Sequence, residues 1–375
     1  GTRTLTIDST SYVSSYRMVV TPPTITSTAS AGTGTKTYSS STTSVCTIDS
    51  STGVVAFVSV GTCTIGASIA ADSSYITATA SAVSFSVVYE VGDTGAGGGI
   101  VIYYSETAFT STGSACNTAG VGGISTCKYL EAAPSGWIVA SQTPVQTNCI
   151  TAGTSTVDPR CVWSGDTSNA IGSTAQGTAI GTGHANTTAI ILQNNTAGKA
   201  ATVSRAYQGG GKTDWFLPSR DELNELCKYA ANTGQASGSD TVCTGRGAAT
   251  ERGFSTDIYW SSSETEPLKA WGQYFWDGVQ NNTSKLGGYY VRPVRAGGTP
   301  AAAPSAPTGV SITASSGSLS VAFTAGATGG SAITSYKYST DGGTTFYTRA
   351  SGTTDSPLVI STLSTTGSTA LTNGT

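Results

Sequence analysis

The chain contains eight cysteines and a single histidine, residue types from which metal-binding and reactive sites are often built. No two cysteines have the Cys-x-x-Cys spacing of a zinc site, and His184 adds too few ligands to complete one. We therefore expect no bound metal and expect disulfides, which indicate an oxidising compartment. Sequential pairing would close short loops, each stabilising the fold by roughly 3 kcal/mol, between Cys46 and Cys63, Cys116 and Cys127, Cys149 and Cys161, and Cys227 and Cys243.

Two glycine-containing segments share only part of a phosphate-binding motif. The segment 91–104, VGDTGAGGGIVIYY, continues as a strand pattern without a following Gly-Lys-Ser/Thr, so we interpret its glycines as turns before a strand. The Gly-Lys-Thr at 211–213 lacks the glycine that should stand five residues before it, where the chain has Ala206. Residues 214–218 also do not begin a helix. We expect no nucleotide site.

The sequence contains no recognisable arrangement of catalytic residues. His184 is predicted to lie in a Gly/Thr/Asn loop, and no serine or cysteine stands in a recognisable nucleophile elbow. The Asp and Glu residues leave a glycosidase-type carboxylate pair open as an alternative. We expect no catalytic residues, no cofactor and no enzymatic activity.

Composition favours a mainly β protein of several domains. Of 375 residues, 47 are Gly and only 10% are charged, which suits short strands and turns better than long helices. The length predicts about two to four domains. A net charge of -3 with scattered Lys and Arg argues against a phosphate-binding surface, so we expect no nucleic-acid partner. No apolar run approaches the roughly 20 residues that a membrane-spanning helix needs, and no signal-peptide pattern opens the chain.

Residues 1–90 show the alternation of a β-sandwich. Turn clusters such as DSSTG at 49–53 separate the segments. The predicted strands are 4–7, 44–48, 54–58, 63–69 and 83–87.

Residues 91–298 form a second predicted domain with the clearest helix of the chain. Ser219 and Glu222 have the spacing of a capping box, and Gly234 is expected to end the helix. A second helical pattern covers 197–207. One face of the first helix is predicted to lie in the core through Leu223, Leu226, Cys227 and Ala230.

Three motifs in this region occur in a fixed order: WFLPSRDE at 215–222, YWSSSE at 259–264 and VRPVRA at 291–296. Together they resemble the C-terminal domain of the Legionella collagen-like adhesin, a family with a C-type-lectin-like fold that is shared with formylglycine-generating enzymes. The resemblance implies an α+β binding module on a bacterial surface. We see no counterpart of the reactive cysteine pair of those enzymes, and neither Glu-Pro-Asn nor Trp-Asn-Asp for calcium-dependent sugar binding.

The resemblance also separates structural from binding residues. Trp215, Trp260 and Trp271 are expected in the core, and Arg292 and Arg295 in buried ion pairs with Glu222 or Glu264. The segment 265–290 contains polar and aromatic candidates for glycan or acidic polysaccharide binding, although an ordinary solvated hairpin is an equal alternative. The broader set is Lys269, Gln273, Tyr274, Asp277 and Gln280, and the four residues that we predict on an exposed ligand-binding surface are Trp276, Asn281, Asn282 and Lys285.

The flanking segments resemble surface-protein modules. Residues from Thr37 onward resemble bacterial immunoglobulin-like repeats, whose paired cysteines Cys46 and Cys63 match. After a Pro/Ala/Gly linker at 299–306, residues 307–375 resemble a fibronectin type III domain that lacks its last two strands, with Tyr336, Tyr338 and Phe346 placed for sandwich packing.

An incomplete sandwich would expose apolar surface and unpaired backbone groups. We expect either that the chain continues beyond Thr375, the favoured alternative, or that a strand from another subunit completes the domain. The segment 2–20 is the one donor strand we can suggest.

Two functions follow for such a modular chain. The first is an extracellular bacterial structural protein of a fibre, sheath or surface layer that displays the lectin-like module. The alternative is a monomeric or oligomeric adhesin that binds glycans or polysaccharide. Placement of the lectin-like domain between two spacer domains favours the first.

Overall fold

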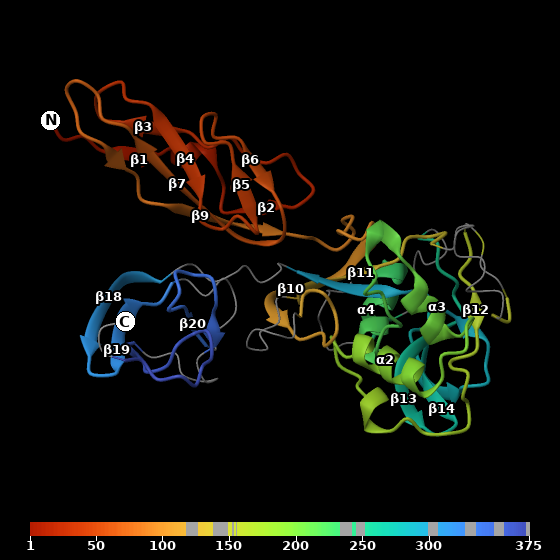
Figure 1. The fold of residues 1–375 in the computed structure, drawn as a ribbon. Coiled ribbons are helices and arrows are strands. Elements are labelled where there is room, and N and C mark those ends of the chain that lie inside the picture. Colours follow the sequence, from red (N-terminus) through yellow and green to blue (C-terminus); the bar gives the residue numbers. More distant parts are fainter. Residues whose placement is uncertain are drawn as a thin grey trace. The chain divides into compact units, whose positions relative to one another are not determined.

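The computed structural model describes residues 1–117, 127–137, 149–151, 154, 156–232, 242–244, 252–298, 307–326, 335–348 and 356–372. These form two compact units, one built from the described residues up to 298 and the other from those beyond 306. The fold is mainly β, as the composition predicts, with three α-helices among the described residues (Figure 1). The predicted division near residue 90 falls within the first unit, and the linker at 299–306 lies outside the described residues.

The N-terminal part of the first unit, residues 1–90, consists of strands around one apolar core. A sheet of order β2-β9-β7-β4 carries β8 beside β7, while β1 pairs with β3 and β5 with β6. Alternate residues of β7 are buried, which matches the predicted period of two. The elements are β1 Leu5–Ile7, η1 Ser9–Ser11, β2 Ser15–Arg17, β3 Ser27–Ala29, β4 Lys36–Ser40, β5 Cys46–Ile48, β6 Val55–Phe57, β7 Gly61–Ile69, β8 Ala78–Thr79 and β9 Val83–Val88.

The central part, residues 91–298, holds two sheets and all three described helices. One sheet has the order β10-β11-β17, and the other has the order β12-β16-β13-β14-β15. The strands are β10 Ile100–Phe109, β11 Cys127–Ala132, β12 Arg160–Cys161, β13 Ile258–Glu266, β14 Lys269–Tyr274, β15 Gln280–Ser284, β16 Tyr289–Tyr290 and β17 Val294–Gly298. The helices are α2 Gly183–Gln193, α3 Ala200–Ala206 and α4 Arg220–Ala231, with 3-10 turns η3 Ser173–Ala175 and η4 Gly209–Gly211.

Helix α4 begins with the predicted capping box. The Ser219 Oγ accepts a bond of 3.3 Å from the Glu222 N–H, and the Ser219 N–H donates to Glu222 Oε2 at 2.7 Å. The helix ends with left-handed Asn232, while the predicted stop at Gly234 lies outside the described residues. The predicted core face is confirmed, because Leu223, Leu226, Cys227 and Ala230 are all buried in one apolar cluster.

The glycines before β10 form turns, as predicted. Gly97 and Gly99 donate their backbone N–H groups to the buried Glu131 carboxylate at 2.9 and 3.2 Å. A Cβ on Gly97 would lie 2.7 Å from the Trp215 ring, so this close approach requires glycine. The Gly-Lys-Thr at 211–213 is likewise followed by extended chain and not by a helix.

Tryptophan burial differs in part from the prediction. Trp215 and Trp260 are buried in the core. Trp271 is only half-buried, because it lies on β14 next to the edge strand β15, and the Arg220 guanidinium stacks over it at 5.4 Å. The placement of Trp271 in the core was therefore wrong.

The two arginines of the closing motif form buried ion pairs, as expected, but with other partners. The Arg292 Nε donates to both Asp158 carboxylate oxygens at 2.9 Å. Arg295 Nη1 donates to Glu131 at 2.8 Å. Both acids lie far away in sequence, so spacing along the chain does not indicate these partners.

The expected partners Glu222 and Glu264 are engaged elsewhere. Glu222 caps α4 through Ser219. Glu264 pairs with Lys285 at 2.6 Å. The predicted arginine pairing with these two glutamates was wrong.

The second unit contains a sheet of order β18-β19-β22 and a pair β20-β21. Tyr336 packs edge-on against Phe323 at 4.7 Å between ring centres. Phe346 is 59% exposed, which contradicts its predicted place in a sandwich core. The strands are β18 Thr308–Ser315, β19 Ser318–Thr324, β20 Lys337–Tyr338, β21 Tyr347–Thr348 and β22 Leu358–Ile360.

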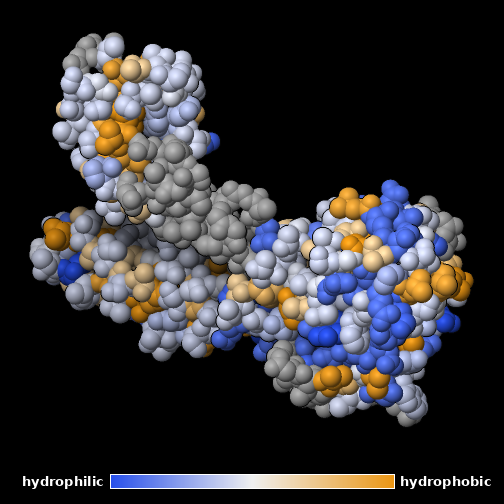
Figure 2. Space-filling view, turned by 90° about the horizontal axis from the view of Figure 1, so that it is seen from below, coloured by the Kyte–Doolittle hydropathy of each residue, from blue (hydrophilic) through white to orange (hydrophobic). Residues whose placement is uncertain are grey.

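Surface character differs between the parts. The visible face of the central part, on the right in Figure 2, carries most of the strongly hydrophilic residues beside separate hydrophobic patches. The other parts show mostly intermediate hydropathy, in line with their Ser and Thr content. Among the described helices, none is both long and apolar enough to cross a membrane.

Candidate binding cleft

The hairpin of β14 and β15 positions most of the predicted binding residues. Its register pairs Trp271 with Asn282 and Gly272 with Asn281. Because successive strand residues point to opposite faces, the two asparagines face different sides of the hairpin. Both are exposed on β15, which is the last strand of its sheet.

The turn of the hairpin directs one aromatic ring inward and the next outward. The Tyr274 N–H donates to the Val279 carbonyl at 2.9 Å, and the Gly278 N–H donates to the Tyr274 carbonyl at 2.9 Å. Gly278 has φ 77°, a conformation that favours glycine. Phe275 is buried beneath the turn, whereas Trp276 is 51% exposed.

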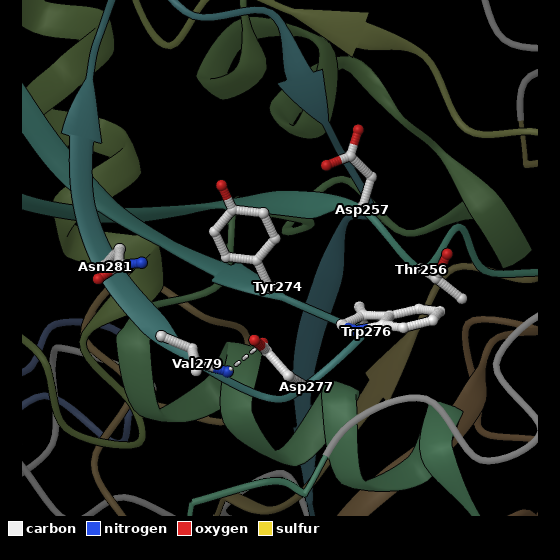
Figure 3. Close-up of a pocket in the computed structure, with 7 residues that line it drawn as sticks. All are labelled: Thr256, Asp257, Tyr274, Trp276, Asp277, Val279 and Asn281. Carbon is white, nitrogen blue, oxygen red and sulfur yellow. Dashed lines mark hydrogen bonds between the residues drawn. The ribbon is translucent and has the colours of Figure 1, made fainter.

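An open cleft of about 370 Å³ lies at this turn, and we call it the hairpin cleft. Figure 3 shows Tyr274 in the middle, with Asn281 on one side and Trp276 beside Thr256 on the other. Its lining residues are Thr256, Asp257, Tyr274, Trp276, Asp277, Val279 and Asn281.

Two carboxylates give the hairpin cleft its charge. Asp277 Oδ1 accepts the Val279 N–H at 3.0 Å. Asp257 Oδ1 accepts the Ile258 N–H at 2.8 Å. Both side chains are exposed, and the seven lining residues include no Lys, Arg or His.

A smaller hollow of about 170 Å³ adjoins the hairpin cleft. The two share Tyr274 and Asn281, and Asn282 lines only the smaller one. The structure therefore places two of the four predicted residues, Trp276 and Asn281, at the hairpin cleft and a third, Asn282, at the hollow beside it.

Lys285 does not belong to this surface, and the prediction that it is exposed was wrong. Its side chain is fully buried, and its Nζ donates to Glu264 Oε1 at 2.6 Å and to the Pro267 carbonyl at 2.8 Å. The same ammonium lies 4.6 Å from the centre of the Trp163 ring. The buried Glu264 carboxylate lies on β13, which β14 separates from β15, and its ion pair with Lys285 fastens the base of the hairpin.

The segment that contains the hairpin cleft is similar to a known family. Residues 160–295 match the Lcl C-terminal domain. The match supports the predicted resemblance of this segment to the C-terminal domain of the Legionella collagen-like adhesin. It indicates a surface, adhesin-like protein. No curated protein matches the chain.

The segment that matches the Lcl C-terminal domain contains the whole hairpin cleft. Its range includes the helices α2 to α4, the five strands β12 to β16 and both hollows. Motif spacing along the sequence predicted the hairpin but missed Thr256, Asp257 and Val279. Asp257 and Thr256 directly precede β13, and strand pairing between β13 and β14 brings them beside the turn.

His184 lies in the matched segment, on helix α2 and not in the predicted loop. Burial, followed by the charge of Arg205, lowers the pKa of His184 to about 4. Its ring packs 5.6 Å from that of Phe216, and its buried Nδ1 has no hydrogen-bond partner among the described residues. No group of three or more His, Cys, Asp or Glu in the described ranges is arranged to hold a metal ion.

Disulfides brace the matched segment and the strands before it. All eight cysteines lie in the described ranges, and they pair in sequential order without leaving a free thiol. The bonds join Cys46 to Cys63, Cys116 to Cys127, Cys149 to Cys161 and Cys227 to Cys243. The last of these ties helix α4 to residue 243, and both of its cysteines are buried in the core.

Proposed function

We propose that this chain is an extracellular bacterial adhesin whose Lcl C-terminal domain binds glycans through the hairpin cleft. The observation that supports this most is Trp276, which is half-exposed at a cleft also lined by Tyr274, Asn281 and two carboxylates. A sugar presents an apolar face that stacks on an aromatic ring and hydroxyls that bond to amide and carboxylate oxygens.

A rigid support beneath the hairpin favours binding. Phe275 is buried under the turn, and the Lys285–Glu264 pair fastens the other end of the hairpin. A site whose side chains are held in place before the ligand arrives loses less conformational entropy on binding. The four disulfides support an oxidising, extracellular setting.

Binding without catalysis fits the hairpin cleft better than hydrolysis. A glycosidase normally holds its general acid in a shielded, apolar setting. Asp257 and Asp277 are both exposed at the cleft. We therefore propose no enzymatic activity and no cofactor for this chain.

A glycan array tests the proposal directly. The full chain should bind a subset of glycans, and Trp276→Ala should reduce those signals by about tenfold, which corresponds to the loss of one stacked ring. Trp271→Ala is the matched control, because Trp271 lies on the same hairpin but does not line the cleft. Equal loss in both variants, or none in Trp276→Ala, would contradict the proposed site.

A structural role in a fibre or sheath is the second candidate. It is supported by β18, the first strand in the order β18-β19-β22, whose eight residues are all exposed. Exposed edge strands can pair with another chain. Electron microscopy of the purified full chain should then show filaments, whereas separate particles at all concentrations would favour the adhesin.

A further inference from the structure

A cavity of about 350 Å³ in the first unit shares no lining residue with the hairpin cleft. Tyr89, which follows β9, and Tyr129 on β11 line it, and their rings meet edge to face with centres 4.7 Å apart. Met18 adds an apolar side chain, while Lys212 and Arg295 add cations. We call this second candidate site the tyrosine cavity.

The hydroxyl of Tyr89 lacks a partner within the protein. Tyr89 is only 6% exposed, and its hydroxyl forms no hydrogen bond with a described residue. Buried hydroxyls are normally hydrogen-bonded, because leaving water without a new partner is unfavourable. Burial, followed by the charge of Glu131, raises the pKa of Tyr89 to about 12, so this group stays protonated at neutral pH and can donate to a ligand.

The ammonium of Lys212 also lacks a counter-ion. Lys212 is half-buried at the tyrosine cavity, and it forms no ion pair with a described residue. The lining residues include no Asp or Glu. The segments 118–126 and 299–306, which lie next to lining residues in the sequence, contain no Asp or Glu either.

Other charges around the tyrosine cavity are paired. Arg295 forms ion pairs with Glu131 and Asp214. Asp93, a carboxylate that acts on the buried tyrosine, pairs with Arg17. The unpaired ammonium is therefore the lining cation that remains for a ligand.

We propose that the tyrosine cavity binds a small aromatic carboxylate. Aromatic rings pack edge-on against one another, so the wall formed by Tyr89 and Tyr129 suits a ring. The ligand carboxylate accepts a hydrogen bond from the Tyr89 hydroxyl and a charge-assisted bond from the Lys212 ammonium. The volume is within the range of small-molecule sites. This inference goes beyond the proposed glycan binding, because it concerns a separate site.

Two ligands of the same shape test the proposal. The full chain is titrated by calorimetry with benzoate, which is anionic at neutral pH, and with benzamide, which is neutral. We expect benzoate to bind about tenfold more tightly. Lys212→Gln should abolish this preference, whereas Lys269→Gln, which removes an equal charge outside the cavity, should keep it. Tyr89→Phe keeps the ring but removes the hydroxyl, and it should weaken benzoate binding about tenfold.

The outcomes decide this proposal independently of the proposed function. Equal affinity for benzoate and benzamide overturns it, as does the failure of both to bind. A preference that survives in Lys212→Gln overturns it too. Should Lys212→Gln fail to fold, unchanged benzoate affinity in Tyr89→Phe overturns it. Trp276→Ala, which alters the hairpin cleft, should leave benzoate binding unchanged, so glycan binding can fail or succeed separately.

Discussion

The two ends of the β14–β15 hairpin contain similar polar residues with opposite roles. At the turn, Trp276, Asp277 and Asn281 are exposed and line a cleft. At the base, Lys285 is fully buried against Glu264. Exposed groups at the turn can exchange water for a ligand, whereas the buried pair at the base can only support the fold. A polar residue in a hairpin therefore indicates a binding site only where packing against the neighbouring strands leaves its side chain exposed to solvent.

The largest effect is expected at the base. Lys285→Ala leaves the Glu264 carboxylate buried without its cation, and we expect a loss of about 3–5 kcal/mol in the free energy of unfolding. Denaturant unfolding followed by tryptophan fluorescence measures it. Lys269→Ala, which breaks the exposed pair with Glu266, is the control and should cost about 0–1 kcal/mol. Similar losses in both variants would remove the contrast between the two ends.

A second effect depends on pH and on the capping box of α4. Burial raises the pKa of Glu222 from 4.5 to about 7, against the hydrogen bonds from Ser219 and Gly181 that lower it. The folded state therefore binds the Glu222 proton more tightly than the unfolded state does. The contribution of this proton to the free energy of unfolding is complete below pH 4.5 and is lost as the pH rises towards and through 7. The change amounts to about 3 kcal/mol at most.

Glu222→Gln isolates that contribution. His184 acts in the opposite direction over a similar range, since its pKa of about 4 lies below its ordinary 6.5 and the fold loses stability as pH falls between these values. The difference in unfolding free energy between parent and variant cancels the His184 contribution. That difference should change between pH 4.5 and 7, and a constant difference would contradict a protonated Glu222.

The smallest effect on stability is expected at the turn. Trp276→Ala removes a half-exposed ring and should change the free energy of unfolding by less than about 0.5 kcal/mol, although it weakens glycan binding. Thermal unfolding of the variant measures the change in stability, and a glycan-binding titration of the same variant measures the loss of binding. Phe275→Ala, one residue away but buried, should cost about 3–5 kcal/mol. A large loss of stability in Trp276→Ala would mean that this ring supports the fold and does not serve a ligand.

Local patterns were sufficient for several features. The capping box of Ser219 and Glu222, the apolar face of α4, the alternating strands of the first 90 residues and the turns before β10 all depend on residues close together in sequence. The helix α2 was missed because its residues, GHANTTAIILQ, have only a weak apolar periodicity and no capping side chain. Tertiary packing forms this helix, and His184 is buried with it.

The sequence by itself determined which residue types stand at the hairpin, how the cysteines are spaced and where α4 begins, because these depend on short-range geometry. Only the tertiary structure decided which charged groups pair: Lys285 with Glu264, and Arg292 with Asp158. It also decided that Asp257 and Trp276 line the same cleft. Each of these contacts joins strands or loops whose neighbours are set by sheet order and register. Burial and charge partners follow from that long-range pairing, and no local pattern in the chain encodes them.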